Sequence, residues 1–130
     1  MNEIFKAIYD RLSASLTEAV YDHVPQDLSD SGYPYVKLHT LDLEDGDTDL
    51  EEGFNAEFKV TAFSRYRGSK EIATLQENIY NSIHRYNFPD TTSYGITGCH
   101  QASCVITTLD DGLTRMSAQR FIIIFEPLPI

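Results

Sequence analysis

The side chains best suited to chemistry are two cysteines and four histidines. Cys99 and Cys104 form a C-x4-C pair with His100 beside the first of them. A zinc site would need a second ligand pair at finger-like spacing, and the sequence has none. We therefore predict two reduced structural thiols and no metal, with a half zinc site and a disulfide as alternatives. If both cysteines lie on one extended strand, their odd separation predicts that they point to opposite faces.

Catalytic motifs are missing from the sequence. It has no G-x-S-x-G, H-E-x-x-H, phosphate-binding or dinucleotide-binding pattern. Ser103 and Cys104 have a histidine nearby, but a nucleophile needs a base placed beside it in space. His84 adjoins an apolar stripe and is interpreted as a boundary residue. We predict that the chain is not an enzyme and takes no cofactor. A cytosolic enzyme or ligand-binding domain with a deep apolar pocket is kept as an alternative.

An acidic run between residues 42 and 52 stands out. It contains no Lys or Arg, and its carboxylates are Asp42, Glu44, Asp45, Asp47, Asp49, Glu51 and Glu52. The spacing from Asp45 to Asp49 resembles the start of a calcium loop. However, Leu50 stands where that loop needs glycine and Ala56 where it needs glutamate. Because crowded like charges repel, we predict a solvated loop over about 42–53, poorly ordered in the isolated subunit. A cation-binding module is the alternative.

A basic cluster interrupts this acidic chain. Arg65, Tyr66, Arg67 and Lys70 fall within six residues. Three charges are too few for much affinity for nucleic acid. The cluster is either a solvated turn between a strand and a helix or a docking patch for an acidic surface.

These groups must be positioned by regular elements, which the apolar periodicity indicates. Helices are predicted at 3–16 and 69–86, where apolar residues recur at helical spacing, with Ser69 as N-cap and Phe88-Pro89-Asp90 ending the second. Strands are predicted at 34–41, 54–62, 100–109 and 115–126, with a short extended piece near Val20 and a hairpin turn at 110–112. The order α-β-β-α-β-β predicts an α+β fold. Its sheet is mainly antiparallel, with four to five strands and two helices packed on it.

Chain length and net charge limit the number of domains, the compartment and the binding partners that can be expected. A chain of 130 residues with 42% hydrophobic residues is expected to fold as a single domain over residues 1–130. No apolar run approaches the length of a membrane span, and the amino end has no signal-peptide pattern, so the cytosol is the expected compartment. The formal charge of −10 disfavours tight binding to DNA.

Several segments, taken in order, resemble a known family. The most specific is Phe63-Ser64-Arg65-Tyr66-Arg67-Gly68-Ser69-Lys70-Glu71 leading into the second helix. Others are Val20-Tyr21, Val24-Pro25, Pro34-Tyr35-Val36, and Asp110 to Arg115 before the last strand. Together they resemble the small tail-completion proteins of long, non-contractile-tailed phages and prophages. That family includes tail terminators and tail-to-head joining proteins. Relatives often have tryptophan in place of Phe63, and the acidic stretch is longer here than is usual.

The resemblance implies a structural protein of the virion tail, assembled in the host cytoplasm, without catalytic residues. A tail terminator forms a ring, commonly a hexamer, on the end of the tail tube. It stops polymerisation and joins the tail to the head connector. The expected partners are other copies of the chain, the tail tube protein and the connector protein, with DNA passing only in transit. A head-to-tail joining protein docking on the connector is the alternative within the family. The partner interface is assigned as a hypothesis to Arg65, Tyr66, Arg67, Lys70, Asp45, Asp47, Asp49, Glu51 and Glu52.

Overall fold

Two helices form where the apolar stripes predict them. The computed structural model describes residues 2–25, 32–43 and 54–129. Helix α1 spans Asn2–Ser15 and α2 spans Lys70–Ile83. Their inward stripes are fully or almost fully buried, and consist of Ile4, Ile8 and Leu12 in α1 and Ile72, Leu75, Ile79 and Ile83 in α2. Burying each such side chain contributes roughly 1.5–3 kcal/mol, so these stripes hold the helices to the core.

The start of α2 agrees with the sequence prediction, whereas its end does not. The helix ends at Ile83 rather than at residue 86, because His84 is extended and Arg85 has a φ of 61°. Phe88-Pro89-Asp90 therefore follows the end of the helix and does not cause it. At the other end Ser69 is the N-cap residue, but its side chain makes no capping hydrogen bond. The Ser64 hydroxyl instead donates to the Glu71 carboxylate over 2.6 Å.

The strands form one mixed sheet. They are β1 (Ala19–Tyr21), β2 (Tyr35–Leu38), β3 (Asp42–Leu43), β4 (Phe54–Ser64), β5 (Tyr94–Thr108) and β6 (Arg115–Pro127). The order across the sheet is β1-β2-β4-β6-β5, with β3 pairing to β4. Only the β1–β2 pair is parallel. The α+β class with a mainly antiparallel sheet is confirmed. The short strand β3 takes up the start of the segment predicted as the acidic loop.

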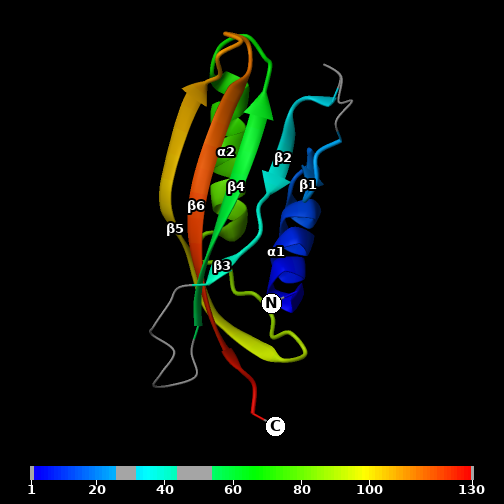
Figure 1. The fold of residues 1–130 in the computed structure, drawn as a ribbon, viewed down its shortest axis with the longest axis vertical. Coiled ribbons are helices and arrows are strands. Elements are labelled where there is room, and N and C mark those ends of the chain that lie inside the picture. The colour runs from blue at the N-terminus through cyan, green and yellow to red at the C-terminus, as the bar shows by residue number, and fades with distance from the viewer. Residues whose placement is uncertain (1, 26–31, 44–53, 130) are drawn as a thin grey trace.

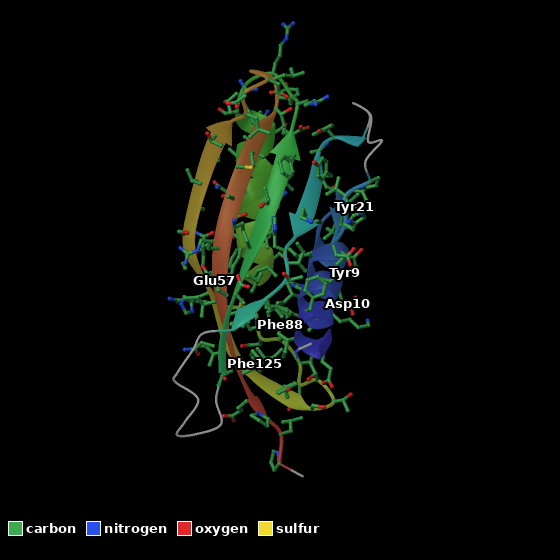
Figure 2. The ribbon with its side chains drawn as sticks, viewed as in Figure 1. Tyr9, Asp10, Tyr21, Glu57, Phe88 and Phe125 are labelled. Carbon is green, nitrogen blue, oxygen red and sulfur yellow. The ribbon has the colours of Figure 1, made fainter. Side chains whose placement is uncertain are left out.

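The two helices pack on the same face of the sheet, as Figure 1 shows. Alternate residues of β4 and β6 point into that layer, and the Phe58 and Phe121 rings stack with centroids 5.4 Å apart. Tyr9 of α1, labelled in Figure 2, donates a hydrogen bond to the Val20 carbonyl over 3.0 Å, and this bond ties the helix to β1. The opposite face of the sheet carries no helix of the described residues. The half-buried Ile122 and Ile124 lie on that open face.

Strand β5 departs most from the prediction. It begins at Tyr94, six residues before the predicted start at 100, and includes Gly95 and Gly98. Register shifts interrupt its pairing with β6 between Ile96 and Gly98 and between Gln101 and Ser103.

The second register shift lies between the two cysteines and changes the face of the sheet to which Cys104 points. Cys99 pairs with Ile123 and Cys104 with Gln119, and these two β6 residues point to the same face. Both cysteines therefore lie on the helix-covered side, and the prediction of opposite faces is wrong. A single extra residue between them restores a common orientation.

Candidate assembly surfaces

The basic cluster forms the turn between β4 and α2. Arg65 is folded back onto the protein: its Nε donates to Thr114 Oγ1 over 3.0 Å, and its guanidinium lies 4.4 Å from the centre of the Tyr33 ring. Arg67 and Lys70 are exposed, and Tyr66 is 54% exposed. The structure thus brings the four predicted residues together on one turn but gives them different surroundings.

The β5–β6 hairpin supports this turn from the side. Asp111 accepts hydrogen bonds from the Leu113 and Thr114 amides, both 2.8 Å long, and from the Thr114 hydroxyl at 2.7 Å. These bonds, with the Thr114 amide foremost, lower the pKa of Asp111 to about 2. Asp111 also lies 3.9 Å from the Arg65 guanidinium. The hairpin predicted from Asp110-Asp111-Gly112 is confirmed, with Gly112 at a φ of 70°.

Two residues outside the predicted cluster complete this end of the molecule. Arg115 Nη1 donates to the Tyr66 carbonyl over 3.1 Å, which adds a fourth cation beside the turn. Leu113 is 48% exposed and lines a cleft of about 350 Å³ together with Tyr33, Arg65, Tyr66 and Glu71. Their role depends on pairing across the hairpin, and sequence spacing gives no signal of it. We define the basic end as Arg65, Tyr66, Arg67, Lys70, Leu113 and Arg115.

The acidic partners predicted for this cluster lie outside the described residues. Asp45, Asp47, Asp49, Glu51 and Glu52 all fall in the segment 44–53. That segment joins β3 to the first residue of β4, whereas the basic turn follows the last residue of β4. The two charged features are thus attached at opposite ends of one strand of 11 residues.

The open face of the sheet carries an aromatic cluster. Tyr35 packs between Tyr21, Tyr33 and Phe63, with ring centroids 5.8, 5.0 and 4.9 Å away. Burial in this cluster raises the pKa of Tyr35 to about 12. Phe63 thus packs in this aromatic cluster on the open face and lies outside the buried core. Further along the same face Arg120 pairs with Glu57 and donates to the Ser103 hydroxyl over 3.3 Å.

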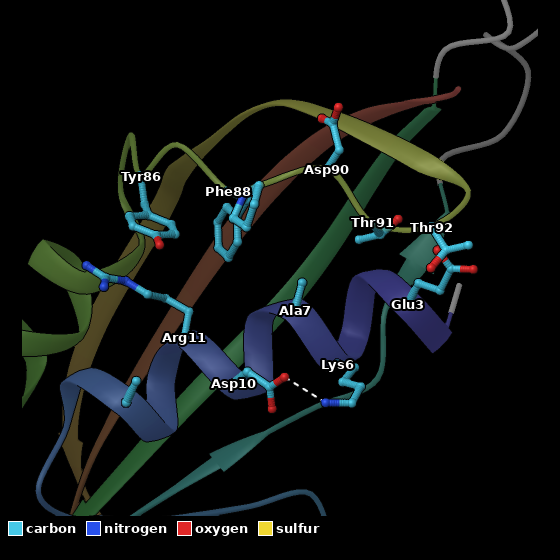
Figure 3. A pocket seen from close by; sticks show the side chains of 12 residues that line it. Glu3, Lys6, Ala7, Asp10, Arg11, Tyr86, Phe88, Asp90, Thr91 and Thr92 are labelled. Atoms are coloured by element: carbon cyan, nitrogen blue, oxygen red, sulfur yellow. Dashed lines mark hydrogen bonds and ion pairs between the residues drawn. The ribbon is translucent and has the colours of Figure 1, made fainter. Parts of the chain in front are cut away.

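A groove of about 460 Å³ lies between α1 and the 86–92 segment (Figure 3). Several of its charged side chains are bonded to each other or to neighbouring residues outside the groove. Lys6 pairs with Asp10 over 2.7 Å, and Arg11 donates to the Ser82 carbonyl and stacks on Tyr86. Glu3 accepts two hydrogen bonds from Ser93, and the backbone bond is the main cause of its lowered pKa. This pairing is typical of groups that stabilise a fold.

The cysteines and histidines do not form a shared site. Cys99 is buried, which raises the pKa of its thiol to about 12, whereas Cys104 is exposed. His84 Nδ1 accepts a hydrogen bond from the Gln101 amide, and the His84 ring stacks on Tyr80, so it packs at the helix boundary as interpreted. Within residues 2–25, 32–43 and 54–129, no group of three or more potential metal ligands comes together. In the same part of the chain, no helix is both long and apolar enough to cross a membrane.

Comparisons with known proteins identify a shared fold. No protein-family model matches the chain, and no curated protein sequence matches it. Among solved structures, the chain is similar to one chain of a structure described as the virion of a native gene transfer agent (GTA) particle. The two superpose with a TM-score of 0.83 and 17% sequence identity, over 96% of each chain. This protein therefore shares, over nearly its whole length, the fold of a chain found in a GTA virion.

Proposed function

We propose that this chain is a structural subunit of a phage-like tail, acting as a tail terminator. In this role its copies form a ring, commonly of six, on the end of the tail tube, stop its growth and present a surface to the head connector. The observation that carries the proposal is the superposition over 96% of both chains on a component of a GTA virion. The order of sequence segments that resembles tail-completion proteins supports it independently.

The surfaces described above fit assembly better than catalysis. Charged groups in the groove beside α1 are bonded within the fold, whereas the basic end offers exposed Tyr66, Leu113, Arg67 and Lys70. Aromatic and arginine side chains are enriched at protein interfaces. We assign the basic end to the contact with an acidic face of the tail tube or of a neighbouring subunit.

The net charge suits a protein that surrounds passing DNA. Tight binding to DNA requires cations that replace the counterions of its phosphates. With a formal charge of −10, a ring of these subunits offers few such cations, and DNA can pass without adhering. The proposal assigns DNA no role as a stable ligand.

Tail assembly with and without this chain tests the function. Tail tube protein is polymerised alone and with the purified chain, and tube lengths are measured by electron microscopy. A terminator caps tube ends with rings and stops further growth when more tube protein is added. A head-to-tail joining protein would leave tube growth unchanged and be retained by purified connector protein instead. Binding to neither partner would reject the assembly function.

A further inference from the structure

The C-terminal half of β5 is exposed on both faces of the sheet. Residues 102–108 are all exposed, with Val105 at 58% and Ile106 at 39%. Strand β5 ends the sheet, so among the described residues no strand pairs with its outer edge. Figure 1 shows it as the border of the sheet farthest from β1. This part of β5 thus presents main-chain donors and acceptors together with apolar side chains.

The strand lacks the features that usually protect such an edge. Exposed edges are commonly blocked by charged residues, proline or bulges. From Gln101 to Leu109 the sequence has neither charge nor proline. Both register shifts lie before Ser103, and from Ser103 to Thr108 the pairing with β6 is regular. Six consecutive residues therefore form an unprotected edge.

We infer that this edge joins each copy of the chain to the next, with residues Val105–Thr107 pairing to β1 of a second copy. The inference rests on the proposed function, because it takes a ring as given and assigns its contact. A ring built from one repeated contact needs two different, complementary surfaces on each subunit. We assign these two roles to the ends of the sheet, β5 and β1, where β1 already has one carbonyl, that of Val20, bonded to Tyr9.

The strand registers place β1 and residues Val105–Thr107 of β5 at the same level of the sheet. Tyr21 pairs with Lys37, Lys37 with Thr61, Thr61 with Ala118, and Ala118 with Val105, so one row crosses the whole sheet. By the same pairings Val20 shares a row with Ile106, and Ala19 shares one with Thr107. The three residues of β1 therefore lie level with the three residues proposed to receive them.

Strand direction and side-chain orientation agree with this contact. Because only the β1–β2 pair is parallel, β1 and β5 run in opposite directions. A copy rotated about an axis along the strands would present β1 antiparallel to β5. Val105 and Tyr21 both lie on the open face, where an aromatic side chain next to a β-branched one stabilises paired strands.

Charge favours a second copy over other occupants. Copies with a charge of −10 repel one another, so they approach with least cost where the surface is neutral. The β5 edge is such a surface. An edge meant for a strongly charged partner would be expected to carry complementary charges.

Cys104 provides a probe without any substitution. It is exposed and next to Val105, whereas Cys99 is buried with a thiol pKa raised to about 12, so a maleimide should modify Cys104 alone. We expect its modification to be at least ten-fold slower in rings, at high concentration or on tube ends, than in dilute monomer. Rings that leave Cys104 as reactive as in the monomer would overturn the inference but not the proposed function. Failure of the unmodified chain to form rings under any condition would instead reject the ring itself.

Paired substitutions identify the partner strand. Thr107→Lys or Ala19→Glu alone should weaken ring formation at least ten-fold in light scattering, and the double variant should regain it, because these residues share a row. Ala73→Lys on the exposed side of α2 makes the same charge change as Thr107→Lys and should have no effect. Thermal unfolding should be similar for all four variants. If Ala19→Glu has no effect and rescues nothing, β5 pairs with something other than β1, and the head-to-tail contact is wrong.

Discussion

At the scale of single residues, the two arginines of the basic turn have different surroundings. Arg65 contacts Thr114 and Tyr33 within the same subunit, whereas Arg67 is exposed. A basic side chain that already binds its own subunit contributes to folding as well as to docking. Equal charge at neighbouring positions therefore does not imply equal function.

Substituting each arginine separately should distinguish a contribution to folding from a contribution to docking. We expect Arg65→Gln to lower the free energy of unfolding by about 1 kcal/mol, the scale of a lost cation–π contact and hydrogen bond. Arg67→Gln should leave unfolding unchanged and weaken binding to tube ends. Urea unfolding and tube-end binding measure the two quantities. Equal destabilisation by both substitutions would show that the exposed arginine also serves the fold.

Asp111 should make the hairpin sensitive to acid. Its folded pKa of about 2 lies below the ordinary value of 3.8, so its carboxylate stabilises the fold above about pH 4. This contribution is lost as pH falls toward 2. Asp111→Ala should lower the melting temperature at pH 7, and the difference from the unmodified chain should shrink toward pH 2. Asp110→Ala, with the same charge change in the adjacent turn position, is the control, and a difference independent of pH would contradict this account.

At the scale of elements, the core of the sheet depends on facing aromatic rings. Phe58 on β4 and Phe121 on β6 are paired in register, stacked and almost fully buried. Phe58→Ala should cost about 3–5 kcal/mol, because it removes apolar contacts and leaves a cavity. Leu113→Ala, at a 48% exposed position, should change stability by less than about 0.5 kcal/mol. Urea unfolding of both variants tests whether the core lies where the structure places it.

Periodicity predicted the elements whose burial is regular. The helical stripe of α1 and the alternation of β4 were readable because one face is buried and the other is not. The start of β5 was missed because Gly95 and Gly98 disfavour strands, and pairing with β6 overrides that preference. The end of α2 was misplaced because the positive φ of Arg85 depends on tertiary contacts, including the bond from its amide to the Cys99 carbonyl.

The candidate surfaces were predictable only in part. Arg65, Tyr66, Arg67 and Lys70 are adjacent in sequence, so their common location followed from a short turn. Arg115 and Leu113 join them through the hairpin, and the β5 edge is exposed only because the sheet ends there. Such features arise from long-range pairing, which residue spacing does not encode.

At the scale of the whole molecule, salt should separate the two proposed contacts. Raising ionic strength from about 0.01 M to 1 M shortens the screening length from about 30 Å to 3 Å. Pairing at the neutral β5 edge should strengthen, because repulsion between acidic copies is screened. Docking of the basic end on an acidic surface should weaken. Light scattering of the free protein and sedimentation with tubes measure the two effects, and a common direction for both would show that one contact accounts for all binding.

The position of the basic turn at the end of β4 bears on how a subunit approaches an acidic partner. The acidic segment joins one end of the strand and the basic turn follows the other, about 35 Å away at the usual rise per residue. In the proposed docking, the field of an acidic tube end acts on the cations of the basic turn and draws that end of the subunit forward before contact forms. We therefore expect the orientation of the subunit to be selected during diffusion, before it binds.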